Sequence, residues 1–438
     1  INPDGRDRYT HWFRMTGNRW PDADPVSREH MEPWPGGRTN HYYFDLNRDW
    51  AWQTQTESDS RIKLYNQWLP HIHVDFHEQG INSPYYFAPA AEPYHEYITD
   101  WQRELQTMIG KNHAKYFDKN NWLYFTKEVF DLLYPSYGDT YPTYNGAIGM
   151  TYEQAGHSRG GLAIETEDGD TLSLLDRITH HYTTGLSTVE VASQNVNRIV
   201  DEFVKFFSEG KNNPKGEYNT YIISKSNHID KLNDLQSWLD KNGIQYGTAS
   251  ASRSYKGFNY KTGETGSVKI NVGDLVISAN QSKSVLVQVL FEPQTTLRDT
   301  LTYDLTAWAI PYVYGLDAVA VKSDVKMSTA KRLVSKTEKS SGVPYAYILP
   351  WKGIWDVKFL SVLFKNDVVV RVTEEPFELN GKTFDSGTLV ITRKGNEKLG
   401  KNFDHIIQKA ALEKHRNLTV ASTGFVTKGK DFGSSSIR

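Results

Sequence analysis

The segment from Pro70 to Gly80 carries the densest group of side chains that could bind a metal ion or carry a proton. Apolar residues alternate in it with titratable ones, in the order His71, Ile72, His73, Val74, Asp75, Phe76 and His77. Alternation with a period of two residues is typical of a β-strand. We therefore predict a strand with one apolar face and one face of potential ligands.

Only one of His73 and His77 is expected to bind a given ion. Four residues of straight strand set their Cα atoms about 13 Å apart, whereas a histidine nitrogen lies about 2.0–2.1 Å from zinc. His77 is the expected ligand, because it lies at the carboxyl end of the strand, where α/β proteins place their sites. From this segment alone, the interpretation that these histidines are hydrogen-bonded scaffold groups stays open.

A second segment, from Asp45 to Trp50, places Asn47 beside Arg48. An arginine offers a fork of N–H donors, and with the neighbouring amide it forms a natural clamp for a carboxylate. The alternative for this segment alone is a surface ion pair between Arg48 and Asp45 or Asp49.

A single carboxylate, Glu153, follows an apolar stretch that contains Gly146 and Gly149. A partly buried glutamate there would have a raised pKa, which suits a general base. The alternative is a glutamate at the end of a strand that faces solvent.

Composition restricts the class of protein. With 438 residues, the chain favours two domains, at roughly 100–200 residues each. Its 50 Lys and Arg and 52 Asp and Glu give a formal net charge of −2, so no general attraction for nucleic acid or an anionic membrane is expected. No run approaches the roughly 18 apolar residues of a membrane span. There is no Cys, which excludes disulfides, thiolate zinc sites and a cysteine nucleophile.

The two halves of the chain differ, and chemistry is expected in the first. Eleven of the 14 histidines lie at or before His181. The polar run from Glu209 to Gly216 contains two Gly and a Pro, which is typical of a linker. We therefore predict one domain over residues 1–210 and a second over 217–438.

The spacing of apolar residues predicts the helices and strands on both sides of that linker. Residues 188–207 are predicted to form one long helix. In the second half, strands are predicted at 221–224, 284–291, 367–372 and 418–421, and helices at 230–242 and 401–415. Strands interleaved with helices predict an α/β domain.

Taken together, these segments resemble the zinc carboxypeptidase family. The resemblance is carried by Asn2-Pro3-Asp4-Gly5, Asn47-Arg48, His77 and Thr151-Tyr152-Glu153, in the family's order and approximate spacing. It covers roughly residues 1–200. It implies an α/β/α sandwich around a mixed sheet with the zinc site at the strand ends, here followed by a second α/β domain as in large bacterial members, which are periplasmic or secreted.

The resemblance also implies roles for single residues. His77 matches the third zinc ligand, and Glu153 matches the general base. Asn47 and Arg48 match the pair that grips the terminal carboxylate of the substrate.

Other matches of the resemblance are looser. Arg14 matches the arginine that polarises the scissile carbonyl, with Arg19 as a rival. Tyr134 and Tyr137 compete for the role of the tyrosine that caps the substrate. Asp139 at the base of the specificity pocket would favour a C-terminal Lys or Arg.

The family's other two zinc ligands form a His-x-x-Glu motif, and no histidine of this chain has Glu three residues later. The motif precedes Asn-Pro-Asp-Gly in the family, so we expect it upstream of Ile1, in a longer polypeptide whose missing segment packs against residues 1–200 and completes both the sheet and the zinc site.

The implied function is that of a zinc-dependent hydrolase, a metallopeptidase that acts on the C-termini of peptides or proteins. The rival is a non-catalytic peptide- or glycan-binding module on the same fold. Its binding groove would be built from Tyr42, Tyr43, Phe44, Trp50 and Trp52.

Overall fold

The computed structural model describes residues 2–159, 161–297, 302–303, 307–330 and 343–438. Contacts divide the chain into two compact units, Ile1–Ser226 with Ser237–Ala330, and Asn227–Gln236 with Lys331–Arg438. The predicted boundary between residues 210 and 217 therefore lies inside the first unit. Elements on its two sides share a core, as shown by the buried hydrogen bond of 2.8 Å between His95 Nε2 and Glu292 Oε1.

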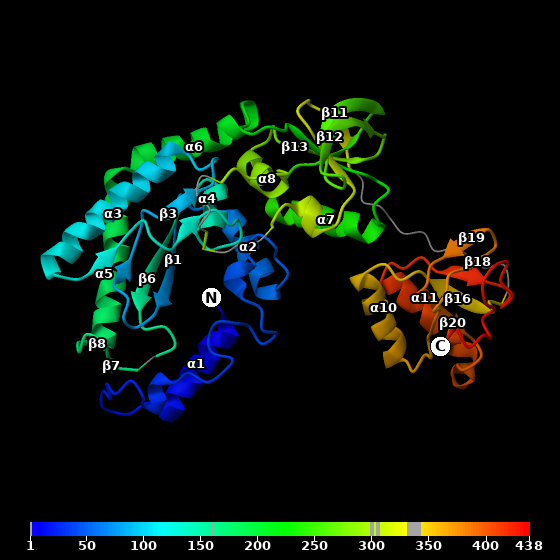
Figure 1. Cartoon of the computed structure of the whole chain (residues 1–438), viewed down its shortest axis with the longest axis horizontal. Helices are drawn as coiled ribbons and strands as arrows, with labels where there is room; N and C mark the ends of the chain where they lie inside the picture. Colours follow the sequence, from blue (N-terminus) through cyan, green and yellow to red (C-terminus); the bar gives the residue numbers. More distant parts are fainter. Residues whose placement is uncertain (1, 160, 298–301, 304–306, 331–342) are drawn as a thin grey trace. The chain divides into compact units, whose positions relative to one another are not determined.

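A four-stranded mixed sheet in the first unit carries the predicted strand (Figure 1). Its strands, in spatial order, are β1 (Ile72–Gln79), β6 (Ile148–Ala155), β2 (Tyr85–Tyr86) and β4 (Tyr124–Phe125). β1 confirms the strand predicted from the alternating pattern, and it pairs in parallel with β6. The register sets His77 directly beside Glu153, so two distant sequence segments meet at one level of the sheet.

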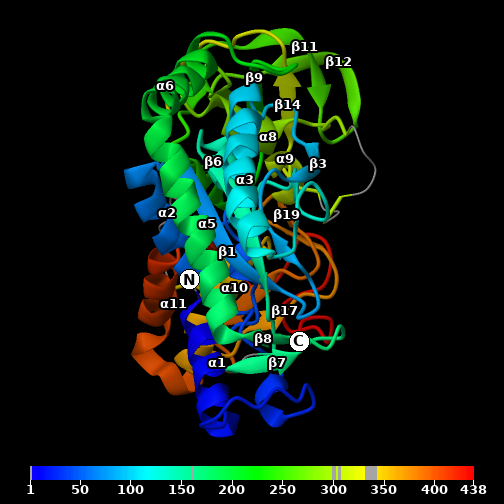
Figure 2. The same cartoon turned by 90° about the vertical axis from the view of Figure 1, so that its left-hand side faces the viewer.

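Two long helices, α3 (Asp100–Asn120) and α5 (Leu174–Gln194), run side by side along this sheet (Figures 1 and 2). Thr99 begins α3 with a capping box, in which its hydroxyl accepts from the N–H of Gln102 and the Gln102 side chain accepts from the N–H of Thr99. Burial of apolar side chains fixes the helices to β6, through Leu105, Ile109, Phe117, Ile148, Met150, Tyr152 and Val191.

The long helix predicted over residues 188–207 is two helices, α5 and α6 (Val196–Asn212), with a break at Asn195. The side chain of Asn195 donates from Nδ2 to the carbonyl oxygen of Val191 at 2.8 Å, and its φ and ψ of −121° and 18° are not helical. A short amide side chain that competes for backbone groups favours such an interruption.

The first unit also contains a seven-stranded sheet. Its strands, in spatial order, are β12 (Glu264–Ile270), β11 (Arg253–Asn259), β14 (Ala318–Val321), β9 (Thr220–Ile223), β13 (Leu275–Ser278), β10 (Gly247–Ala249) and β15 (Met327–Thr329). β9 and helix α7 (Ile229–Asn242) confirm the elements predicted at 221–224 and 230–242.

The strand predicted at 284–291 is wrong, because Ser284–Phe291 forms helix α8. All but one of its eight residues are buried. A short segment that is apolar on every side has no amphipathic period, so pattern alone cannot separate a buried strand from a buried helix.

The second unit is a smaller α/β body. Its sheet has the order β17 (Arg371–Val372), β20 (Leu389–Thr392), β16 (Ala346–Leu349) and β21 (Thr419–Ala421), with helices α10 (Ile354–Lys365) and α11 (Phe403–Glu413) and the hairpin β18 (Phe377–Leu379) and β19 (Lys382–Phe384). β21 and α11 confirm the elements predicted at 418–421 and 401–415, whereas only the last two residues of 367–372 form a strand.

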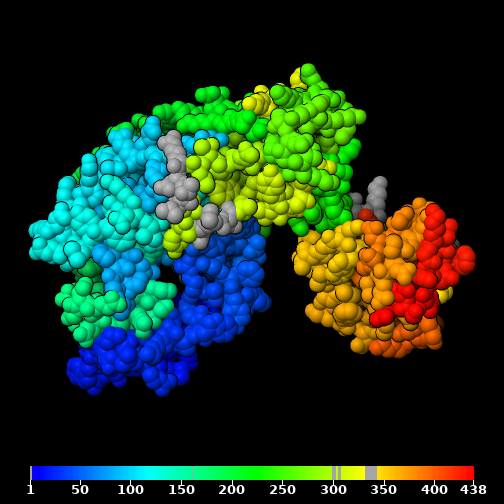
Figure 3. All heavy atoms as spheres, viewed as in Figure 1, coloured from blue at the N-terminus to red at the C-terminus, as the bar shows by residue number. Residues whose placement is uncertain are grey.

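The remaining elements are short or peripheral. They are α1 (Pro3–Thr16), η1 (Arg28–His30), η2 (Leu46–Arg48), α2 (Thr56–Trp68), β3 (Ala91–Tyr94), β5 (Asp131–Leu132), α4 (Thr140–Tyr144), β7 (Ala163–Glu165), β8 (Thr171–Ser173), α9 (Ile310–Val313) and η3 (Glu397–Asn402). In the space-filling view the dark-blue N-terminal segment adjoins the green segment of β7 (Figure 3), where the N–H of Glu165 donates to the carbonyl of Ala23 at 2.8 Å.

The chain is mixed α/β, as predicted. None of the helices in its described part has the length and apolar character needed to cross a bilayer.

Candidate functional site

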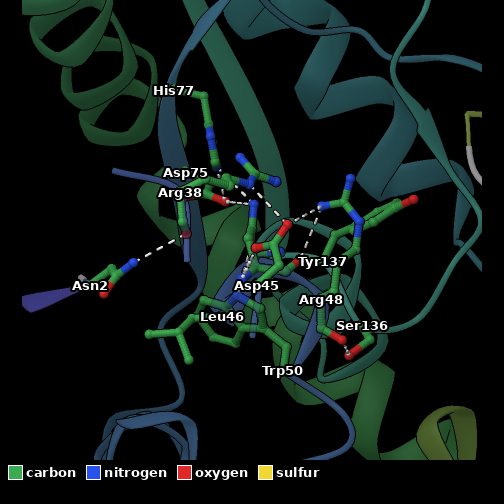
Figure 4. A network of polar contacts seen from close by, with 12 residues as sticks. Asn2, Arg38, Asp45, Leu46, Arg48, Trp50, Asp75, His77, Ser136 and Tyr137 are labelled. Carbon is green, nitrogen blue, oxygen red and sulfur yellow. Dashed lines mark hydrogen bonds and ion pairs between the residues drawn. The ribbon is translucent and has the colours of Figure 1, made fainter. Parts of the chain in front are cut away.

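His77 and Asp75 lie in a polar network toward the carboxyl end of β1 (Figure 4), and Asn47 contacts both of them. His77 Nε2 lies 2.7 Å from Asp75 Oδ2, and Asn47 donates from Nδ2 to the same oxygen at 3.1 Å. Asn47 Oδ1 accepts from Trp50 Nε1 at 3.0 Å and from the N–H of Gly138 at 2.9 Å. Because Oδ1 is held by two donors, Nδ2 is fixed toward Asp75 and His77.

These contacts shift the pKa values of Asp75 and His77. Burial opposes ionisation of Asp75, but the hydrogen bonds from His77 and Asn47 and the charge of His77 hold the pKa of Asp75 below its ordinary value. Nε2 of His77 lies 2.7 Å from Asp75 Oδ2, which as a carboxylate oxygen accepts, and 2.8 Å from Asn47 Nδ2, which donates. Burial lowers the pKa of His77, yet its hydrogen bond to Asp75 raises that pKa overall and makes the ring more basic.

Glu153 lies beside His77 on β6 and is buried, with 7% of its surface exposed. Its Oε2 has no hydrogen-bond partner among the described residues. Burial raises the pKa of Glu153 to about 7, and the charge of Asp75 adds to the rise, while His77 and Arg38 oppose it. Glu153 is therefore not the solvent-facing strand-end residue of the alternative interpretation.

Arg48 and Tyr137 form the next part of the site. The Arg48 guanidinium lies 4.4 Å from the centre of the Tyr137 ring. Its contact with Asp45 is loose, at 3.9 Å, because the same Asp45 oxygen pairs with Arg38 Nε at 2.9 Å. Tyr134 instead accepts a hydrogen bond from Trp52 Nε1 at 2.7 Å.

A cavity of about 50 Å³ joins these side chains. Its lining residues are Arg38, Asn47, Arg48, His77, Phe130, Asp131, Tyr137, Asp139, Thr151, Glu153 and Tyr303. The sequence left Tyr134 and Tyr137 as equal candidates, and only Tyr137 lines this cavity.

Asp139 lies at the buried side of the cavity. Its Oδ2 accepts from Thr151 Oγ1 at 2.7 Å, and its Oδ1 accepts from the N–H of Thr140 at 2.7 Å. Burial raises the pKa of Asp139 to about 6, against the effect of the Thr151 hydrogen bond. Asp139 is thus held by its neighbours rather than standing free at the base of a pocket.

The structure does not bring Arg14 or its rival Arg19 to the site. Arg14 is exposed near the end of α1, and Arg19 is exposed with its guanidinium 5.7 Å from the ring of Trp20. Arg38 is the arginine that lines the cavity together with Arg48, His77 and Glu153 among the described residues.

Two other residues of the site were not assigned from the sequence. Asp75 precedes His77 by two residues on the same strand face, so the alternating pattern contained a signal for it. Tyr303 comes from a segment far along the chain, where its N–H donates to Asp131 Oδ2 at 2.8 Å, and the sequence carries no signal for this placement.

Among the described residues, His77 does not belong to a group of three closely spaced metal ligands. In the part of the chain that the structure describes, the one group of three His, Asp or Glu whose ligand atoms lie within 4.8 Å of one another is Asp4, His41 and Glu57. His77 is not in this group, and the expectation that this chain supplies a single zinc ligand stays a prediction.

The aromatic groove of the rival interpretation is not formed as one surface. Tyr42, Tyr43 and Phe44 are exposed, whereas Trp50 is buried and donates to Asn47.

Comparison of the chain with family models, with curated proteins and with solved structures found no match in any of the three.

Proposed function

We propose that this chain is a zinc-dependent carboxypeptidase, or the major part of one, which removes C-terminal residues from peptides. The observation that carries the proposal is the convergence of His77, Glu153, Asn47 and Arg48 on one cavity. These four residues come from three separate sequence segments, and each segment carries side chains suited to one part of the reaction. The same resemblance leads us to propose a periplasmic or secreted bacterial protein.

The residues around His77 fit one ligand position of a zinc site. His77 Nε2 lies 2.7 Å from the Asp75 carboxylate, and a carboxylate partner of this kind orients a metal-bound histidine and makes it more basic. We propose that His77 holds zinc together with a His and a Glu from outside the 438 residues. When bound, zinc polarises the scissile carbonyl and acidifies a water molecule.

The chain's own residues would perform the remaining steps. Glu153, with a free Oε2 and a raised pKa, accepts a proton from water and delivers it to the leaving amine. Arg48 and the Asn47 amide bind the terminal carboxylate, with Tyr137 packed against the Arg48 guanidinium. Arg38, rather than Arg14, lies where it can stabilise negative charge on the scissile carbonyl.

We further propose that the outside segment pairs with β1. Among the described strands, β1 is at the edge of its sheet and pairs only with β6. An open groove of about 620 Å³ follows this edge and includes Leu64, Trp68 and Phe76, all of which are largely exposed. An unpaired edge with apolar neighbours is a template for a further strand.

The carboxypeptidase assignment predicts that Arg48 selects substrates with a free C-terminus. The natural polypeptide should cleave a free-acid peptide and leave its C-amidated form almost intact. Loss of a charge-assisted hydrogen bond costs on the order of 2 kcal/mol, so Arg48→Ala should lower kcat/KM for the free acid by about 30-fold. The measurement is release of the C-terminal amino acid from both peptides.

The matched control is Arg28→Ala, which removes an exposed arginine of η1 that does not line the cavity. Equal cleavage of both peptides by the unmutated protein would end the exopeptidase assignment. Binding of peptide without any cleavage would favour the non-catalytic module.

A further inference from the structure

Helix α5 carries a stripe of exposed apolar side chains. Its members recur every three or four residues, so they lie on one side of the helix. More than half of the surface of each is exposed, and they are Leu175, Ile178, Tyr182, Leu186 and Val189. At 1.5 Å per residue, this α5 stripe extends over about 21 Å. Continuous apolar areas on a protein surface mark sites of interaction.

The α5 stripe faces away from α3, which packs along another side of α5 (Figure 2). Asn112 of α3 donates from Nδ2 to Ser187 Oγ at 2.8 Å and to Glu190 Oε2 at 2.6 Å. At about 100° of rotation per residue, Tyr182 and Val189 lie about 140° and 160° from Ser187 around the helix. The polar side of α5 therefore contacts α3, and the apolar side does not.

The apolar side of α5 instead lies next to the edge of the sheet. Phe76 of the edge strand β1 has its ring 5.0 Å from the ring of His181, and a Cβ on Gly185 would lie 3.7 Å from Phe76 Cζ. Tyr182 and Val189 lie within about 60° of Gly185 around the helix. Because Phe76 also lines the groove along β1, the α5 stripe and that groove form one continuous exposed region.

The charges of α5 favour a protein partner over a lipid surface. Helices that lie in a membrane interface carry Lys or Arg on their polar face. α5 has three charged residues, Asp176, Arg177 and Glu190. Arg177 is buried and pairs with Glu78 at 3.5 Å, so the exposed charges of α5 are acidic. An anionic lipid surface would repel them.

The spacing of helices and strands indicates which partner covers the α5 stripe. Neighbouring helices pack about 8–10 Å apart, whereas neighbouring strands lie about 4.8 Å apart. A helix beside α5 would therefore lie over the second strand position beyond β1. One unit of strand and helix would cover both the β1 edge and the α5 stripe. A second copy that docked on the α5 stripe alone would leave the backbone of β1 unpaired.

We propose that an amphipathic helix of the outside segment packs along the α5 stripe and is joined to the strand that pairs with β1. The inference rests on the outside segment of the proposed function, but it does not depend on zinc or on hydrolysis. A helix of about 15 residues spans the 21 Å of the stripe. A natural polypeptide that shows this contact and hydrolyses no peptide would keep this inference and refute the carboxypeptidase.

Photocrosslinking of the natural polypeptide tests the contact. p-Benzoylphenylalanine placed at Tyr182 keeps an aromatic ring in the α5 stripe, and mass spectrometry identifies the peptide to which it becomes joined. The expected product joins position 182 to a peptide of the same polypeptide from outside the 438 residues, in a yield that does not change with protein concentration. The matched control is the same replacement at Tyr312, an exposed tyrosine of α9, which should not form this product.

Two results of the crosslinking would overturn the proposal. A product that joins position 182 to a second copy of this chain, in a yield that rises with concentration, would make the α5 stripe a dimer interface. A product with lipid, or no product at all, would show that the helix is not there.

A charge placed in the α5 stripe gives an independent measurement. Val189→Asp should lower the melting temperature of the natural polypeptide by at least about 5 °C, because a covering helix would bury an unpaired carboxylate. Val272→Asp places the same charge at an exposed valine in a turn, and should change the melting temperature by less than about 2 °C. Equal shifts would show that position 189 is uncovered. If Val189→Asp does not fold, the crosslink at position 182 decides.

Discussion

Replacing Glu153 by Gln should lower the turnover of peptide hydrolysis by about 10²–10⁴-fold, the usual contribution of a general base. The amide cannot take a proton from water at neutral pH, whereas the carboxylate can. Glutamine has nearly the same shape, and Oε2 makes no hydrogen bond in the described structure, so packing of β6 should be preserved. The measurement is single-substrate kinetics on the natural polypeptide with its zinc content and folding checked in parallel.

Glu78→Gln is the matched control for Glu153→Gln. Glu78 lies on β1 next to His77, but its side chain is 43% exposed and reaches toward Arg177 at 3.5 Å, away from the cavity. This variant should keep near-normal turnover. If Glu153→Gln also kept near-normal turnover, Glu153 would be only a structural carboxylate.

Replacing His77 by Ala should remove most of the zinc from the natural polypeptide, from about one ion per chain to a small fraction. A catalytic zinc normally has three protein ligands, and loss of one leaves two. For the same reason the 438-residue chain alone, which supplies only His77, should hold little stoichiometric zinc. Elemental analysis after extensive dialysis measures both.

His73→Ala is the control for this variant. His73 is on the same strand and the same face, but its ring packs 5.3 Å from Trp50 and 5.8 Å from Tyr65. Because His73 is too far along the strand to share an ion with His77, zinc should be retained. Tight zinc in the 438-residue chain that survives His77→Ala would show that another group, such as Asp4, His41 and Glu57, is the metal site.

The sequence predicted well those features that depend on local pattern. The alternation from His71 to His77 was sufficient for β1, because one face of that strand packs on the core and the other carries polar groups. The helix at 230–242 was found for the same reason, since its apolar residues recur at a helical spacing. The almost completely buried segment at 284–291 has no exposed polar face, and its helix could not be told from a strand.

Contacts between segments that lie far apart in the sequence were harder to predict. That Glu153 sits beside His77 depends on the parallel register of β1 and β6, which no short-range pattern encodes. Arg14, with Arg19 as its rival, was matched from the loose spacing of the family resemblance, whereas the fold leaves both of them exposed. Tyr303 lines the cavity although it lies far along the chain from the other lining residues. Only the three-dimensional structure shows that it belongs to the site.

The most direct test of the proposed zinc carboxypeptidase is a crystal of the natural polypeptide, with diffraction data collected on both sides of the zinc absorption edge. An anomalous peak should appear beside the imidazole ring of His77, near Oε2 of Glu153, which has no hydrogen-bond partner among the described residues, and at no other protein group of comparable height. A strong peak at Asp4, His41 and Glu57 with none beside His77, or no zinc peak in an active preparation, would contradict the account.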